Sequence, residues 1–165
     1  VFSAENLTNK FINPDKKKFG EVEGITDKDW YTNSCHLDVE QKATAFEKID
    51  FEGEFSKYTP GGVTCMIDCN SLKNNPMALD ALWNYSYNSN IPYMSINIKE
   101  DICFNCGFIG EHIPSDNGYI CPCCGNSDPN SQQVIRRISG YLVDASERPI
   151  NHSKKSEIDH RVVHY

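Results

Sequence analysis

The pattern of hydrophobic and polar residues predicts a strand, a helix and a second strand in the middle of the chain. A short apolar run at residues 63–67 follows the Pro-Gly-Gly break at 60–62 and predicts a buried strand. Residues 76–87 begin with proline and carry apolar residues at helical spacing. Residues 91–98 alternate and predict another strand. This order is typical of a parallel βαβ unit within a larger sheet or barrel, so the expected fold class is α/β.

Weaker patterns predict the remaining elements. Apolar residues recur every three or four positions over 39–49, which indicates one face of a helix. Residues 1–25 are polar and lysine-rich, and we expect mostly loop there with some helix. Residues 30–32 look extended, and residues 155–165 look like a short terminal helix.

Charge and length exclude several classes of protein. The 165 residues carry a net charge of −7, and the positive charges are scattered apart from short lysine runs at 16–18 and 154–155. A nucleic-acid binder needs a basic face, and none is visible. No apolar run is long enough to cross a membrane, and no secretory signal is visible in these residues. The start at Val1 suggests a piece of a longer polypeptide, although processing would look the same.

Paired cysteines near the end of the chain predict a structural metal site. Two CxxC pairs are each followed by glycine, and they are formed by Cys103, Cys106, Cys121 and Cys124. This pattern is typical of zinc knuckles, in which glycine tolerates the positive φ of the tight turn. Four thiolates leave no coordination position for water, so we expect a structural zinc ion, with a small hairpin through residues 108–120.

Two features qualify this zinc ribbon. Cys123 lies between the expected ligands of the second knuckle, and we prefer to read it as an unliganded thiol rather than as an alternative ligand. Residues 100–133 carry acidic residues and no Lys or Arg, so the ribbon should repel phosphates. We therefore expect a folding or docking element. Without a signal peptide, a reducing cytoplasm is favoured over a disulfide framework for the eight cysteines.

Residues 137–141, Arg-Ile-Ser-Gly-Tyr, resemble the motif shared by glycyl radical enzymes. In that family the glycine loses a Cα hydrogen and holds a backbone radical, which would make Gly140 the radical site. A side chain would hinder the planar radical centre, so this chemistry needs glycine. The alternative reading of Gly140 is an ordinary turn or strand glycine.

Motifs along most of the chain resemble the C-terminal part of an anaerobic (class III) ribonucleoside-triphosphate reductase, most closely the versions in T-even-type bacteriophages and bacterial relatives. They occur in order at residues 31–37, 60–63, 103–124, 135–142 and 148–151. The resemblance implies the C-terminal portion of a ten-stranded glycyl-radical-enzyme barrel in residues 1–99. It further implies a Cys₄ zinc ribbon in 100–133, and a glycyl radical loop with the C-terminal tail in 134–165. One departure from the family pattern is Asp38, because members of that family often have proline at this position.

The resemblance also implies the chemistry and the partners. An activating enzyme with S-adenosylmethionine and an iron–sulfur cluster would abstract hydrogen from Gly140. The glycyl radical then generates a thiyl radical on a cysteine that lies upstream of Val1, and formate is the usual reductant. The substrate would be a ribonucleoside triphosphate. The full enzyme would be an allosteric homodimer in the cytoplasm of a bacterium or a phage-infected host, and this chain alone would be incomplete.

Other candidate residues keep two readings each. Asn33 and Ser34 could line the substrate site of the barrel or form a satisfied polar turn. Arg136 and Arg137 could anchor the loop or dock the activating enzyme, or they could be a solvated basic pair. Two rival functions also stay open: a free-standing glycyl radical spare part that restores a damaged enzyme, and a non-enzymatic zinc-ribbon interaction module.

Overall fold

The computed structural model divides into two compact units. The first unit comprises Val1–Asn97 and Ile150–Tyr165, and the second comprises Ile98–Pro149. The described parts of the chain are residues 8–32, 35–72, 74–138, 141–144 and 151–164.

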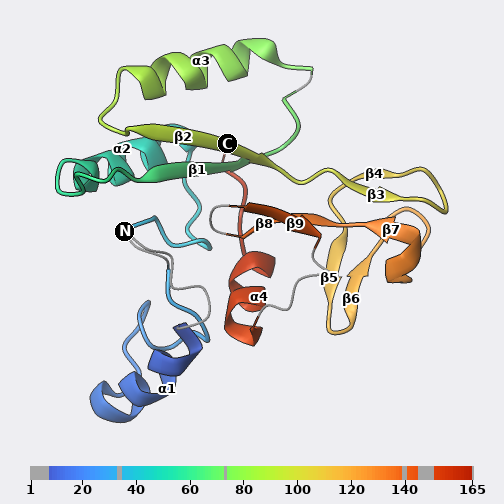
Figure 1. Ribbon diagram of the computed structural model, residues 1–165, viewed down its shortest axis with the longest axis horizontal. Helices are drawn as coiled ribbons and strands as arrows, with labels where there is room; N and C mark the ends of the chain where they lie inside the picture. Colours follow the sequence, from blue (N-terminus) through green and yellow to red (C-terminus); the bar gives the residue numbers. More distant parts are fainter. Residues whose placement is uncertain (1–7, 33–34, 73, 139–140, 145–150, 165) are drawn as a thin grey trace. The chain divides into compact units, whose positions relative to one another are not determined.

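The predicted strand–helix–strand order is present in the first unit. It consists of β1 (Thr64–Cys69), α3 (Pro76–Tyr87) and β2 (Tyr93–Ile98). The two strands form a sheet and run in the same direction, with α3 as the connection (Figure 1). The Asn75 side chain caps the helix by accepting from the amide of Ala78 at 3.2 Å. This confirms a mixed α/β fold, while the larger ten-stranded barrel stays a prediction.

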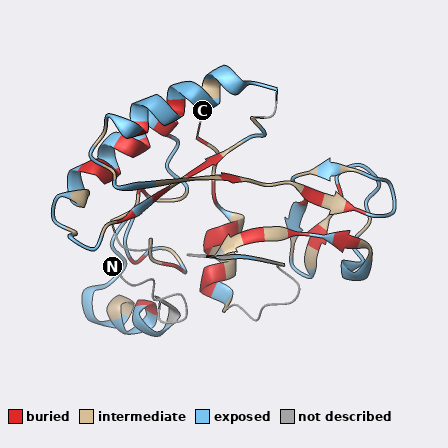
Figure 2. Ribbon diagram, turned by 45° about the horizontal axis from the view of Figure 1, so that its top comes forward, coloured by how far each residue is buried: buried red, intermediate tan, exposed pale blue. Residues whose placement is uncertain are grey.

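The core of this unit lies between β1 and the helices α2 (Ala45–Ser56) and α3. Ile49, Cys65 and Ile67 are fully buried and pack with Leu82. Figure 2 shows these elements with their buried residues in red. Alternate β1 side chains point to opposite faces, so Cys65 and Ile67 face the core together. Burial of each large aliphatic side chain contributes about 2 kcal/mol.

The predicted helix at 39–49 was placed too early. Helix α2 begins at Ala45, and Thr44 is its N-cap in a capping box with Glu47. The Thr44 hydroxyl accepts from the Glu47 amide at 3.2 Å, and the Glu47 carboxylate accepts from the Thr44 amide at 2.8 Å. These two bonds satisfy amides that have no partner within the helix, which fixes the start there.

Three other elements differ from the sequence predictions. The helix expected within residues 1–25 is present as α1 (Thr8–Phe19), but at twelve residues it fills more of that segment than the expected mostly-loop structure. Residues 30–32 form no strand. Helix α4 (His152–Asp159) begins and ends earlier than the predicted terminal helix. It begins there because the Asn151 side chain caps it by accepting from the Lys154 amide at 2.8 Å.

The end of the chain returns to β1. The amide of His164 donates to the carbonyl of Asp68 at 2.6 Å, and the Asp68 amide donates to His164 Nδ1 at 3.1 Å. The Asp68 carboxylate in turn accepts from the Asn97 side chain at the end of β2. Asp68 therefore joins the last strand of the first unit to the C-terminal tail.

The second unit is built from short antiparallel strands. Three of them form one sheet in the order β4 (Ile109–Gly110), β3 (Asp101–Cys103), β7 (Gln132–Gln133). The expected hairpin is present as β5 (Ile113–Ser115) and β6 (Gly118–Ile120). A short 3₁₀ helix, η1, spans Pro129–Ser131. The last ladder pairs β8 (Ile135–Ile138) with β9 (Tyr141–Asp144).

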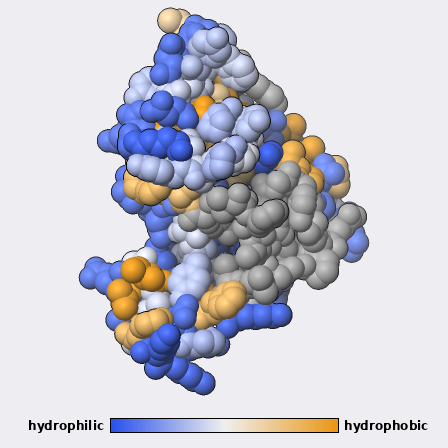
Figure 3. All heavy atoms as spheres, turned by 60° about the vertical axis from the view of Figure 1, so that its left-hand side comes forward, coloured by the Kyte–Doolittle hydropathy of each residue, from blue (hydrophilic) through white to orange (hydrophobic). Residues whose placement is uncertain are grey.

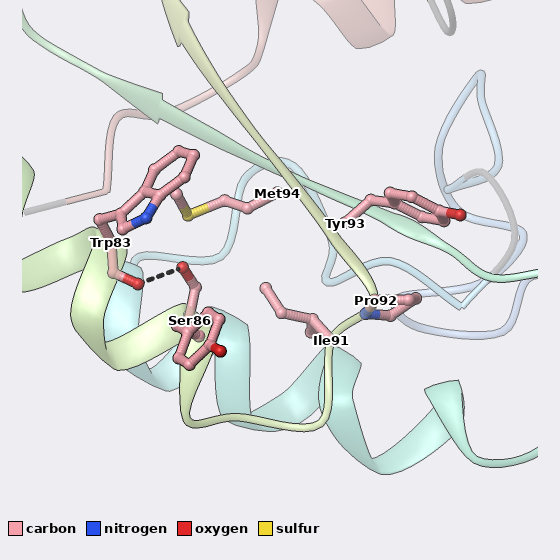
Figure 4. Close-up of a pocket in the computed structure, with 7 residues that line it drawn as sticks. Trp83, Ser86, Ile91, Pro92, Tyr93 and Met94 are labelled. Atoms are coloured by element: carbon pink, nitrogen blue, oxygen red, sulfur yellow. Dashed lines mark hydrogen bonds between the residues drawn. The ribbon is translucent and has the colours of Figure 1, made fainter.

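The coloured atoms on the face shown in Figure 3 are mainly hydrophilic, with separate apolar patches among them. A hollow of about 440 Å³ lies where α3 leads into β2, lined by Trp83, Tyr87 and Tyr93 among others. Figure 4 shows its wall, where the Ser86 hydroxyl donates to the carbonyl of Trp83 at 3.0 Å. None of the predicted site residues that the structure describes, which are the four cysteines, lines it. Among the described helices, none combines the length and the apolar character needed to traverse a bilayer.

Candidate functional site

The two CxxC turns adopt the same local geometry. In the first turn the amide of Gly107 donates to the carbonyl of Cys103 at 2.8 Å, and in the second the amide of Gly125 donates to the carbonyl of Cys121 at 2.9 Å. Both glycines have positive φ, 74° and 72°, as the sequence predicted. The glycine residue therefore closes each turn in a conformation that an L side chain rarely adopts.

The two turns bring four thiols together. The sulfur atoms of Cys103, Cys106, Cys121 and Cys124 all lie within 4.8 Å of one another. The Sγ–Sγ distances from Cys103 to Cys124 and from Cys106 to Cys121 are both 3.7 Å. A tetrahedral zinc ion with Zn–S bonds of about 2.3 Å requires Sγ–Sγ distances of about 3.8 Å. The cluster therefore has the dimensions of a four-thiolate metal site, and Cys123 is exposed and not part of it.

Hydrogen bonds favour thiolate at one of these sulfurs. Burial alone would raise the pKa of Cys103, but peptide amides of its own turn and the Asn126 side chain lower the pKa to about 6. The Asn126 amide lies 3.6 Å from Cys103 Sγ and thus links the second turn to the first. The hydrogen bond from the Phe108 amide would lower the pKa of Cys106, but burial and hydrogen bonds with the three neighbouring thiols together raise it. Four ionised thiols at this distance need a cation between them.

A buried ion pair connects the ribbon to β8. Arg136 is 5% exposed and Asp101 is fully buried. The guanidinium binds the carboxylate through two nitrogens, with a distance of 2.8 Å from Nη2 to Oδ2. Burial would lower the pKa of Arg136, but the Asp101 carboxylate raises it, so the guanidinium stays charged. The reading of Arg136 as a solvated cation is therefore wrong.

The pair also changes the charge of the ribbon. Arg136 neutralises Asp101, and Lys99 Nζ lies 2.6 Å from Glu111 Oε1. Both cations come from just outside residues 100–133, so the count of charges inside that segment overstated its acidity. Asp101 further accepts from the backbone amide of buried His112 at 2.8 Å. Its carboxylate thus fixes three parts of the second unit.

The strands next to the glycine motif form a regular ladder. Arg136 of β8 is opposite Val143 of β9, and Ile138 is opposite Tyr141. Ser139 and Gly140 follow Ile138 in the chain but lie outside the described residues. The radical assignment of Gly140 stays a prediction.

Asn33 and Ser34 also lie outside the described residues, but the segment after them is held firmly. The amide of Leu37 donates to Glu52 Oε1 at 3.2 Å, and His36 Nδ1 lies 3.1 Å from Glu52 Oε2. Glu52 belongs to α2, is fully buried and also pairs with Lys48 at 3.1 Å. Sequence reasoning missed this carboxylate, because a glutamate in a helix normally faces solvent.

Burial by itself would raise the pKa of Glu52. The hydrogen bond from His36 and the positive charge of Lys48 outweigh that effect and lower the pKa to about 2. The Cys65 thiol also hydrogen-bonds to this carboxylate. Burial and the Glu52 charge raise the pKa of Cys65, so this thiol stays protonated at neutral pH and is a core residue.

Comparison with known proteins extends over almost the entire chain. A family model described as anaerobic ribonucleoside-triphosphate reductase matches residues 3–164. The anaerobic ribonucleoside-triphosphate reductase of Haemophilus influenzae is 43% identical over 161 residues, which is 98% of this chain and 23% of that protein. The proteins of the same name from Escherichia coli and Enterobacteria phage T4 are each 42% identical over 98% of this chain, covering 22% and 26% of their own lengths.

The chain therefore spans about a quarter of the length of the curated relatives that it matches. The match includes both CxxC turns, the β8–β9 ladder and the tail. An identity above 40% over nearly the full chain establishes common descent, and the resemblance inferred from the motifs is confirmed. This chain belongs to the anaerobic ribonucleoside-triphosphate reductase family.

Proposed function

We propose that this chain is the radical-bearing C-terminal part of an anaerobic ribonucleotide reductase, which converts ribonucleoside triphosphates to deoxyribonucleoside triphosphates for DNA synthesis. One observation supports this most strongly: the family match runs through the four-cysteine cluster and through the β8–β9 ladder, whose strands precede and follow Ser139 and Gly140 in the chain. Gly140 holds the radical in this proposal, and formate is the reductant.

The four-cysteine cluster has a structural role in this proposal. Cys103, Cys106, Cys121 and Cys124 hold zinc, and a closed set of four thiolates leaves no position for a substrate or a water. Metal binding contributes directly to the folding free energy of the second unit, since few apolar side chains are buried among its described residues. The ribbon thereby holds the β8–β9 ladder in place.

The proposal implies three partners. An activating enzyme with S-adenosylmethionine and an iron–sulfur cluster generates the radical on Gly140. The N-terminal remainder of the reductase supplies the cysteine that receives the radical, the rest of the barrel and the regulatory nucleotide site. Two copies of the full protein form a homodimer. Asn33 and Ser34 contact the ribonucleotide in this proposal, on the segment that Glu52 fixes through His36 and Leu37.

The two rival functions account for less of the chain. A glycyl radical spare part needs only the motif near Gly140, whereas the family match begins at residue 3 and includes the βαβ unit. A zinc-ribbon interaction module needs only the second unit, and it leaves the matched first unit without a role.

Substitution of Gly140 in the intact reductase tests the proposal. Gly140→Ala should abolish ribonucleotide reduction after anaerobic activation, while zinc content and circular dichroism stay at the wild-type level. Gly61→Ala is the matched control, because Gly61 lies in a turn with no atom within 4 Å of an added Cβ and no positive φ. Full activity of Gly140→Ala would contradict the proposal.

A further inference from the structure

Arg136 contacts the strand that leads into each of the two CxxC turns. Asp101, its ion-pair partner, is on β3 and precedes Cys103 by two residues. Tyr119, whose ring lies 4.7 Å from the guanidinium carbon, is on β6 and precedes Cys121 by two residues. The two contacts therefore occupy equivalent positions in the two halves of the ribbon, and one side chain from β8 spans both.

We propose that Arg136 is a positioning residue that couples metal occupancy of the four-cysteine cluster to the position of the β8–β9 hairpin. The metal fixes the distance between the two CxxC turns. That distance sets the gap between Asp101 and Tyr119, where the Arg136 side chain lies. Arg136 thereby makes the position of β8 depend on the distance between the turns. The coupling itself is independent of the proposed radical function. Its consequence for Gly140 rests on that function.

The geometry of the site makes the coupling strict. The guanidinium forms two hydrogen bonds with the Asp101 carboxylate, so both its place and its plane are fixed. The Tyr119 ring provides a second wall, and the Tyr119 carbonyl accepts from the buried side chain of Gln132 at 3.0 Å. If the two turns separate, Arg136 must give up the carboxylate or the ring.

Burial gives the coupling its strength. Asp101 is fully buried and pairs with Arg136. Loss of the guanidinium therefore leaves a buried carboxylate with only the His112 amide as a described hydrogen-bond donor. A lysine cannot replace the two-pronged contact. In β8, Arg136 is paired with Val143 of β9, so displacement of its side chain disturbs both strands of the hairpin.

Hydrogen exchange of the intact reductase tests the coupling without any activity assay. In the wild type, removal of zinc by a chelator should accelerate amide exchange in peptides covering residues 135–144 by roughly tenfold or more, the effect of losing charge-assisted hydrogen bonds. In Arg136→Met with zinc bound, these peptides should already exchange fast, and zinc removal should add little. Slow exchange in zinc-bound Arg136→Met that still responds to the chelator would overturn the proposal.

Lys99→Met is the matched control, because it also removes one cation from the second unit. Lys99 pairs with Glu111 and makes no described contact with β8. Amide hydrogen exchange of residues 135–144 in Lys99→Met should match that of the wild type, both with and without zinc. Exchange as fast as in Arg136→Met would show a general charge effect and would also overturn the proposal.

A second variant covers the case in which Arg136→Met fails to retain zinc. Asp101→Asn combined with Arg136→Met leaves no unpaired buried charge, so the ribbon can keep its metal while the link to β8 is lost. This double variant should show the same fast, zinc-independent exchange in residues 135–144. If it binds zinc and still protects these residues in a zinc-dependent manner, the coupling does not pass through Arg136.

The radical provides a separate measurement. After activation, zinc-bound Arg136→Met should yield several-fold less glycyl radical than Lys99→Met by electron paramagnetic resonance. Equal yields would overturn the coupling to the radical site. A wild-type enzyme that forms no radical would instead contradict the proposed function and would leave the exchange experiment valid.

Discussion

Glu52→Gln should destabilise the first unit strongly, although it changes the side chain by only one atom. The carboxylate is fully buried and receives the Leu37 amide, His36 and Lys48 at 3.1–3.2 Å. Glutamine keeps the shape but leaves the buried Lys48 cation without its anion. The change also weakens the contacts that hold the segment after Asn33 and Ser34.

The loss of stability expected for Glu52→Gln can be derived from the lowered pKa of Glu52. In the folded protein the pKa of Glu52 is about 2, against an ordinary value of 4.5. This difference corresponds to roughly 3 kcal/mol of folding free energy at neutral pH. The penalty for breaking a buried ion pair, about 3–5 kcal/mol, agrees with that figure. Because the folded-state pKa is lowered, the contribution is present above pH 4.5 and is lost as the pH falls towards 2.

Hydrogen exchange of peptides from α2 and β1 provides the assay. At pH 7, Glu52→Gln should accelerate their exchange on the order of 100-fold relative to the wild type. At pH 3 the difference in free energy should fall to roughly half or less, since part of the carboxylate contribution is already lost. Glu54→Gln is the control, because the Glu54 side chain is 67% exposed and its pair with Lys57 is on the surface. Equal exchange in the two variants would show that the buried Glu52 carboxylate does not stabilise α2 and β1.

Two further predictions concern the caps and the metal ligands. Thr44→Ala removes one half of the capping box of α2 and should cost about 1 kcal/mol, measured as faster exchange in the first turn of the helix; an unchanged rate would contradict the role of the cap. Cys124→Ser should lower the zinc content of the purified protein, whereas the adjacent Cys123→Ser should keep one zinc per chain. Retention of zinc in the first variant, or its loss in the second, would assign the ligands differently.

Local signals in the sequence were sufficient for the βαβ unit and for the cysteine turns. Pro76 after Asn75 marks the start of α3, and the observed helix spans Pro76–Tyr87 as predicted. Gly107 and Gly125 indicate the positive φ of each turn, since few other residues adopt it. Such features depend on neighbouring residues alone, and therefore they can be read from one sequence.

Contacts between distant residues could not be read in the same way. Thr44 and Glu47 carry a capping signature, but the apolar spacing that begins at Val39 concealed it. Asp101 and Arg136 are 35 positions apart, and nothing in either local pattern indicates that they meet in the interior. Glu52 likewise lies on a helix whose spacing alone does not mark it as buried. Buried ion pairs are set by tertiary packing, which a residue pattern does not contain.

Electron paramagnetic resonance on the activated, intact reductase shows directly whether Gly140 holds the radical. We expect an organic radical whose doublet collapses when the protein is made with glycine deuterated at Cα, because the splitting comes from the single remaining Cα hydrogen of Gly140. Gly140→Ala should show no such signal, while Gly61→Ala should show it at full intensity. A doublet that persists in Gly140→Ala, or whose splitting is unchanged by deuteration, would show that the radical is not on Gly140.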